Sequence, residues 1–326
     1  MAHQIEQMAY VGDTPWHALG SRLPAKQPLE VWAQKAGMNW KICETPVRFV
    51  AAEKHTESDG QANMLAFEDQ KVLYRSDNHK ALSVVSRRYK VVQPRAVLEF
   101  YRDLTQASGY ELETAGVLKE GRKFWALART GKETKLRGND LVQGYILLAT
   151  SCDGTLATVA THTTVRVVCA NTLAVALDNA RGAVKVPHST TFDPAQVKSQ
   201  LGIAVSQWDG FMGRMKELTD CKVNDAAAEK FLRRLICQTD APVSANERLS
   251  QARALKTVQS LFAGEGRGAE LTSAKGTAWG LLNAVTQFVD HERRARSQDY
   301  RLDSAWFGAG ALLKERALGQ ALALVD

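Results

Sequence analysis

The sequence is short of cysteine and has no apolar run long enough to cross a membrane. Its five cysteines, Cys43, Cys152, Cys169, Cys221 and Cys237, form no C-x-x-C pair, and no histidines are paired at metal-ligand spacing. We therefore expect buried, reduced thiols and neither a metal nor a cofactor. No apolar run reaches the roughly 18 residues of a spanning helix. The opening MAHQIEQMAYVGD lacks a basic region followed by an apolar one, so we expect a cytoplasmic protein without a secretory signal.

The sequence also lacks a recognisable catalytic constellation. His162, His188 and Cys169 could form a Cys/His pair, but nothing in their spacing requires it. The glycine-rich AGEGRG at 263–268 lacks the Lys-Ser/Thr of a phosphate-binding loop and follows no predicted strand, so we expect a loop. HERRARS at 291–297 fits either a site for an acidic partner or the charged end of a surface helix. These absences favour a binding protein over an enzyme.

Positive charge is concentrated in the middle of the chain. The 326 residues carry a formal net charge of +7. Residues 71–190 contain 18 Lys and Arg against 10 Asp and Glu, whereas residues 1–70 contain 6 against 9 and residues 191–326 contain 18 against 16. A localised positive surface on a protein without membrane segments favours nucleic acid as the partner, although a solvated basic face is the alternative.

The densest basic stretch predicts a hairpin and a following loop, at YELETAGVL, KEGRK, FWALART and GKETKLRGND. Single strands bind where cations meet phosphates and rings stack on bases. Of the adjacent Phe124 and Trp125 we expect one buried and one presented to bases. The predicted DNA-binding residues, with both Arg122 and Lys123 at an exposed tip, are Arg87, Arg88, Lys90, Lys119, Arg122, Lys123, Trp125, Arg129, Lys132, Lys135, Arg137 and Arg166.

The hydrophobic pattern predicts an α+β fold: antiparallel strands and hairpins with packing helices over residues 1–190, then an all-helical part over 191–326. Residues 1–40 read as a proline-rich arm with Trp16, ending in a short helix at 29–36. A hairpin closed by Asp153 and Gly154 should join strands at 144–150 and 156–161. Further strands are predicted at 47–52, 64–67, 72–74 and 82–85. Helices are predicted to begin at Pro94, to run at 165–179 and from Asp193 to Leu218, and to lie at 226–238, 244–262, 275–294 and 304–322.

Four strings resemble a family known as phage/plasmid-like proteins, a domain of unknown function. They are YVGDTPWHALG, LSVVSRRYKVVQP, THTTVRVVCANTL and WGLLNAVTQFVDHERRARS, and together they cover nearly the whole length. The resemblance implies a phage or plasmid context and no known reaction. In order of elements and in basic charge, the chain is also similar to phage single-strand annealing proteins.

Two classes of function are consistent with this reading. The first is a non-enzymatic single-stranded DNA-binding protein that anneals or protects strands during recombination, as a homo-oligomeric ring or filament. The second is a DNA- or nucleotide-processing enzyme that uses His162 with the polar residues Asn171 and Asp178. A host-defence antagonist acting by protein interaction is a third reading.

Overall fold

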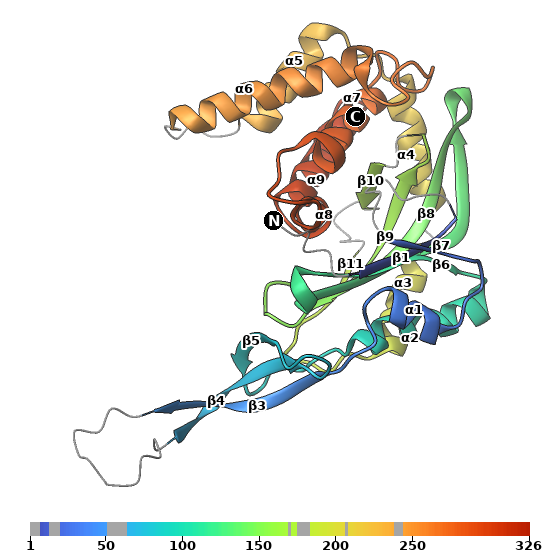
Figure 1. Ribbon diagram of the computed structural model, residues 1–326. Coiled ribbons are helices and arrows are strands. Elements are labelled where there is room, and N and C mark those ends of the chain that lie inside the picture. The colour runs from blue at the N-terminus through green and yellow to red at the C-terminus, as the bar shows by residue number, and fades with distance from the viewer. Residues whose placement is uncertain are drawn as a thin grey trace.

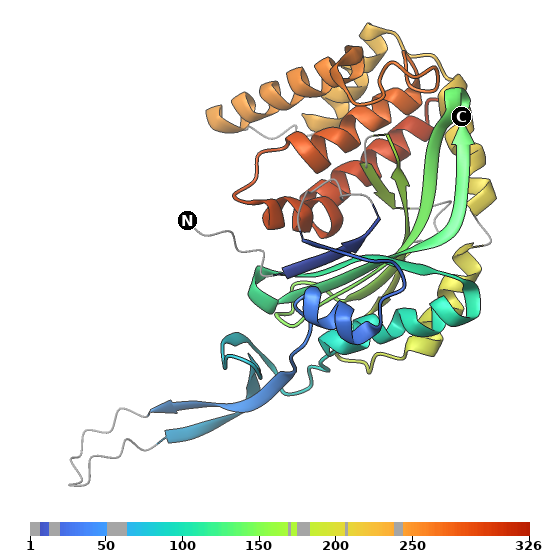
Figure 2. The ribbon, with the colours of Figure 1, turned by 45° about the vertical axis from the view of Figure 1, so that its right-hand side comes forward.

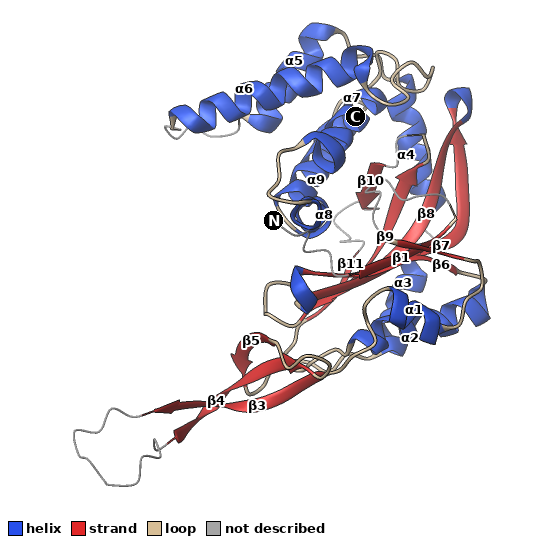
Figure 3. Cartoon of the chain, in the orientation of Figure 1, coloured by secondary structure: helices blue, strands red, loops and turns tan. Residues whose placement is uncertain are grey.

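The computed structural model describes residues 7–12, 20–50, 64–168, 171–174, 183–205, 208–237 and 244–326. Trp16 of the predicted N-terminal arm lies outside these residues, as do Cys169 and Asp178. The described chain forms a large sheet with helices on both of its faces and a second, smaller sheet beside it (Figures 1 and 3).

The large sheet has eight strands. Seven follow the order β10-β9-β8-β7-β6-β1-β2, and β11 also pairs with β9. All of their pairings are antiparallel except that of β1 with β2. The strands are β1 (Gln7–Val11), β2 (Ser21–Leu23), β6 (Glu111–Leu118), β7 (Lys123–Leu136), β8 (Asp140–Ser151), β9 (Thr158–Arg166), β10 (Asn171–Ala174) and β11 (Ala183–Val186).

The smaller sheet contains β3 (Ile42–Val50), β4 (Met64–Arg75) and β5 (Ala81–Ser86) in the order β3-β4-β5. Its long β3–β4 hairpin projects from the rest of the molecule (Figures 1 and 2). The distal half of this hairpin exposes large apolar side chains, namely Phe49, Val50, Met64, Leu65 and Phe67.

Helices cover both faces of the large sheet (Figure 2). One core joins the sheet to α1 (Leu29–Lys35), α2 (Pro94–Ser108) and α3 (Pro194–Val205). On the other side lie α4 (Trp208–Asp220), α5 (Asp225–Ile236), α6 (Ala245–Ser260), α7 (Ala278–Gln287), α8 (Gln298–Phe307) and α9 (Ala309–Leu322), with short turns η3 (Leu261–Glu265) and η4 (Phe288–Glu292). Their core includes Leu136, Val142 and Leu173 of the sheet, so the C-terminal helices pack on it.

The predicted helix at 165–179 is wrong over the residues that the structure describes there, 165–168 and 171–174. β9 continues to Arg166, and β10 then returns antiparallel to it, with Asn171 opposite Arg166. Thr163, Thr164 and Val165 are β-branched, which favours the extended backbone of a strand over a helix. Helical spacing of apolar residues further along the segment was therefore a misleading signal.

Other predictions hold in outline. The β8–β9 hairpin forms, but its connection is longer than a tight turn, because Ala149 pairs with Val159. Asp153 stabilises that loop by accepting from the Thr155 amide at 3.0 Å. Pro94 begins α2, and Ser244 with Glu247 forms the predicted capping box of α6. The helix predicted at 304–322 is instead two helices, α8 and α9, separated at Gly308.

Burial, one part of the cysteine prediction, holds only for Cys152 among the described cysteines. Among the four described cysteines, all of them free, Cys43 and Cys221 are half-buried and Cys237 is exposed. Burial raises the pKa of the Cys152 thiol to about 12, so this thiol is protonated and unreactive at neutral pH. The fold as a whole is the predicted α+β class, with antiparallel sheets followed by helices.

Candidate functional site

The structure separates the predicted basic residues instead of gathering them in one groove. Arg122 lies beside the turn η1 (Lys119–Gly121), at the start of β7, and Arg137 follows the other end of that strand. The 14 residues of β7 span about 45 Å at the usual rise per residue. Residues Lys119 to Lys123 and residues Lys132 to Arg137 therefore belong to different surfaces.

Lys123 is not at an exposed tip, which corrects the prediction for this residue. Its side chain is buried and its Nζ lies 2.5 Å from Oδ1 of Asp303 on α8. Lys119 binds the other oxygen of the same carboxylate at 2.7 Å. The hairpin tip is thus docked on α8, and its two lysines share one counter-charge. Arg122, in contrast, remains exposed.

Trp125 is fully buried, so the prediction that either it or Phe124 faces solvent is wrong. Both side chains have 0% exposure. Adjacent residues of a strand point to opposite faces, and here both faces are covered. Phe124 packs against Trp40, while Trp125 packs edge-on against Trp306 of α8 at 4.7 Å between ring centroids. Trp125 is therefore a core residue and not a platform for bases.

Arg166 is also a core residue. It is 2% exposed and forms a buried ion pair with Asp140, 2.8 Å from Nη2 to Oδ2. Asp140 further accepts hydrogen bonds from Ser273 and from the indole of Trp279. This network joins the sheet to the C-terminal helices, and it removes Arg166 from any DNA-binding surface.

The remaining predicted cations lie at the surface in two groups. The first group forms ion pairs: Arg87 with Glu68, Arg129 with Glu113, and Arg137 with Asp220. The second group is exposed and consists of Arg88, Lys90, Arg122, Lys132 and Lys135. The pairs of Arg87 and Arg137 are exposed and contribute about 0–1 kcal/mol each, so a phosphate could compete for these two arginines. Arg129 and Glu113 are half-buried instead.

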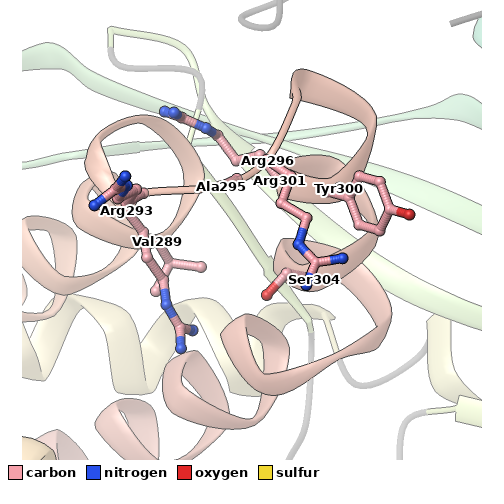
Figure 4. A pocket seen from close by; sticks show the side chains of 8 residues that line it. Val289, Arg293, Ala295, Arg296, Tyr300, Arg301 and Ser304 are labelled. Carbon is pink, nitrogen blue, oxygen red and sulfur yellow. The ribbon is translucent and has the colours of Figure 1, made fainter. Parts of the chain in front are cut away.

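A different set of basic residues comes together in a pocket of about 550 Å³. It lies where η4 ends and α8 begins, and we call it the arginine pocket (Figure 4). In Figure 4, Arg293 lies on one side of the pocket and Arg301 and Ser304 lie on the other. The described residues that line it are Val289, Arg293, Arg294, Ala295, Arg296, Tyr300, Arg301 and Ser304.

The arginine pocket holds four guanidinium groups and, among its described lining residues, no carboxylate. Nη1 of Arg293 and Nε of Arg301 are buried and have no hydrogen-bond partner within the described part of the chain. A buried donor without a partner costs about 1–3 kcal/mol, and more when it is charged. Burial accordingly lowers the pKa of the Arg293 guanidinium. A bound anion would supply the opposite charge to the guanidinium groups that line the pocket.

Two carboxylates, one in η4 and one in α8, are already engaged. Asp303 binds Lys119 and Lys123, and Asp290 binds Lys314 at 2.8 Å in the protein interior. The pocket also opens at the N-terminus of α8, where the helix dipole favours negative charge. The grouping of four arginines, the partial burial of Arg293 and the dipole of α8 therefore all favour an anionic ligand.

The arginine pocket is continuous with the docked hairpin tip. Nζ of Lys119 lies 5.8 Å from the ring centroid of Tyr300, which lines the pocket and is 40% exposed. The sequence did contain a signal for this site, since four arginines fall within residues 293–301. By itself, that run is equally compatible with the charged end of a surface helix. Only the tertiary fold shows that these side chains surround a pocket.

The two histidines considered for catalysis have separate described partners, whereas Cys169 and Asp178 lie outside the described residues. His162 is buried, with its Nε2 3.1 Å from the carbonyl oxygen of Leu201, and His188 stacks on Tyr89. Within the described ranges, no three His, Cys, Asp or Glu side chains group as metal ligands would. No helix among the described residues is long and apolar enough to span a bilayer.

Burial of His162 predicts a pH-dependent stability. Desolvation lowers its pKa from the ordinary 6.5, so the folded protein binds this proton less readily than the unfolded chain does. The stabilising contribution is complete above pH 6.5 and is lost as the pH falls through the lowered pKa. Thermal melts between neutral and mildly acidic pH should show this loss, and His162→Gln should flatten it. The control His79→Gln, at an exposed position, should leave the pH profile unchanged; an unaltered profile in His162→Gln would contradict the assignment.

Comparison with known proteins places the chain in one family. The family model described as "Domain of unknown function (DUF932)" matches residues 81–306. No curated protein and no solved structure shows significant similarity to the chain. The matched range includes β6, β7, the turn η1 and the complete arginine pocket. The chain therefore belongs to the DUF932 family.

Proposed function

We propose that the protein binds single-stranded DNA, with the arginine pocket as the anchor for a phosphate. The observation that carries the proposal is the set of four guanidinium groups around one pocket whose described lining residues include no carboxylate; in two of these groups one nitrogen is buried without a partner in the described chain. Guanidinium forks match phosphate oxygens in geometry as well as charge. The arginine pocket replaces the single groove expected along residues 119–137.

Tyr300 and the hairpin tip supply the second requirement of a single-strand site. The ring of Tyr300 is partly exposed beside the pocket, where a base next to the anchored phosphate can stack on it. Lys119 lies beside that ring, and the exposed Arg122 lies in the same turn as Lys119. Bases of a duplex are already stacked on each other, so this arrangement favours an unpaired strand.

The biological role that we propose is strand annealing or protection during recombination of a phage or plasmid, carried out by a homo-oligomer. The resemblance of the four sequence strings supports the context. The apolar side chains exposed on the distal β3–β4 hairpin support self-association, because exposed apolar patches commonly mark protein interfaces. Light scattering of the full chain, with and without DNA, tests the assembly directly.

Fluorescence anisotropy with labelled single- and double-stranded oligonucleotides across a salt series tests the binding. We expect preference for the single strand and an affinity that falls with salt. Tyr300→Ala should lose roughly 1–3 kcal/mol of binding free energy with an unchanged salt slope, because a stacked base is lost and no phosphate contact is. Tyr300→Phe, which keeps the ring, is the matched control. Absence of binding at low salt would overturn the proposed function.

A further inference from the structure

The charge of the arginine pocket exceeds what an internal phosphate of a DNA strand can neutralise. Each phosphodiester carries one negative charge, while the pocket holds four guanidinium groups and its described lining residues include no carboxylate. A phosphomonoester carries about −1.5 to −2 at neutral pH. The charge balance therefore favours a monoester.

The hydrogen-bond donors of the pocket favour the same group. Nη1 of Arg293 and Nε of Arg301 lack partners in the described chain. Oγ of Ser304 accepts a hydrogen bond from the Gly310 amide at 3.2 Å, which leaves its own O–H to donate toward the pocket. Arg293, Arg301 and Ser304 thus bring donors from three side chains to the pocket, which matches in number the three terminal oxygens of a phosphomonoester, whereas a diester has only two terminal oxygens.

The position of the pocket at the N-terminus of α8 also favours a phosphate group. Phosphate groups bind at helix N-termini because the amides and the helix dipole there favour anions. α8, whose first turn contains Tyr300, starts at the pocket and is 10 residues long. An anchored terminal phosphate would place its own nucleotide next to the Tyr300 ring.

We infer that the arginine pocket binds a phosphomonoester, namely the phosphorylated end of a DNA strand. The inference rests on the proposed function, since it assigns a particular part of the strand to the same site. It implies that the protein engages strand ends in preference to strand interiors. Ends are also where exonuclease action exposes a single strand, so a strand-end binder would act on the products of that class of reaction.

Anisotropy with one oligonucleotide sequence carrying a 5′-phosphate, a 3′-phosphate or two hydroxyl ends tests the inference. At least one phosphorylated end should raise the affinity roughly tenfold over the hydroxyl ends, equivalent to about 1.4 kcal/mol. The preference should shrink below about pH 6, where the monoester loses its second charge. It should also vanish in Arg293→Ala, and persist in the control Lys132→Ala at the far end of β7.

The outcomes separate this inference from the proposed function. Equal binding of phosphorylated and hydroxyl ends would overturn the inference while leaving single-strand binding intact. Absence of binding by every oligonucleotide would overturn the proposed function. Thymidine 5′-monophosphate serves as a competitor of the labelled strand. If it competes at the same concentration as the phosphorylated strand does, free nucleotides are the ligand, and the assignment to strand ends is overturned. Competition by inorganic phosphate alone at that concentration would likewise overturn it.

Discussion

Replacing Arg293 and Arg301 together by alanine is expected to weaken binding of single-stranded DNA by about 100-fold or more. Each charge-assisted hydrogen bond contributes about 1.5–3 kcal/mol, and every 1.4 kcal/mol is about a factor of ten in affinity. Because both arginines belong to the pocket that anchors one phosphate, the salt slope should also fall, by about 0.7 for the pair. Anisotropy titrations at several salt concentrations measure both quantities.

The same double variant should be no less stable than the original protein in the absence of DNA. It removes two buried donors that have no partner in the described chain, and it relieves repulsion among four like charges. Like charges held close together for binding destabilise the protein without its ligand, so removing those charges should stabilise the free protein. A thermal melt without DNA measures this effect, and a marked fall in melting temperature would show that the two arginines serve the fold.

Lys132→Ala with Lys135→Ala is the matched control for binding. Both lysines are exposed and belong to the surface at the opposite end of β7 from the hairpin tip. Removal of two positive charges there should change affinity and salt slope much less than removal of the two arginines. Equal losses in the two double variants would contradict a localised site and would indicate diffuse electrostatic attraction instead.

Asp140→Ala is expected to destabilise the protein by about 3–5 kcal/mol, because removal of one partner of a buried ion pair leaves an uncompensated charge. Asp140 and Arg166 are 1% and 2% exposed, and Asp140 also accepts hydrogen bonds from Ser273 and Trp279. A loss of this size is a large fraction of the about 5–15 kcal/mol that separates typical folded and unfolded states. Urea denaturation measures it.

Asp220→Ala provides the comparison for Asp140→Ala. Asp220 pairs with Arg137 at 3.3 Å, and both side chains are exposed, so its removal should cost no more than about 1 kcal/mol. A similar small loss in Asp140→Ala would mean that water reaches the Arg166 guanidinium, and the description of a buried network joining sheet and helices would then be incorrect.

Local sequence patterns determined much of the secondary structure of this protein. The proline at the start of α2, the capping box of α6 and the hairpins β6–β7 and β8–β9 all follow from interactions within a few residues. The described residues 165–168 and 171–174 did not follow the helical pattern of their segment, because pairing of β10 with β9 outweighed helical spacing. Helical spacing of apolar residues is therefore a reliable guide only where the backbone has no strand to pair with, even one that is adjacent in the sequence.

The identity of the exposed cations was decided by the tertiary structure alone. Lys123 is neutralised by Asp303, which is 180 residues away in sequence, and Arg166 by Asp140, on a neighbouring strand. Trp125 is buried because helices cover both faces of its sheet, and α8, which packs on it, lies far along the chain. Conversely, the arginines at 293–301 are candidates for binding an anion because they surround a pocket whose described lining residues include no carboxylate. Composition and spacing determine how much charge a segment carries, whereas burial and distant partners determine whether that charge is available to a ligand.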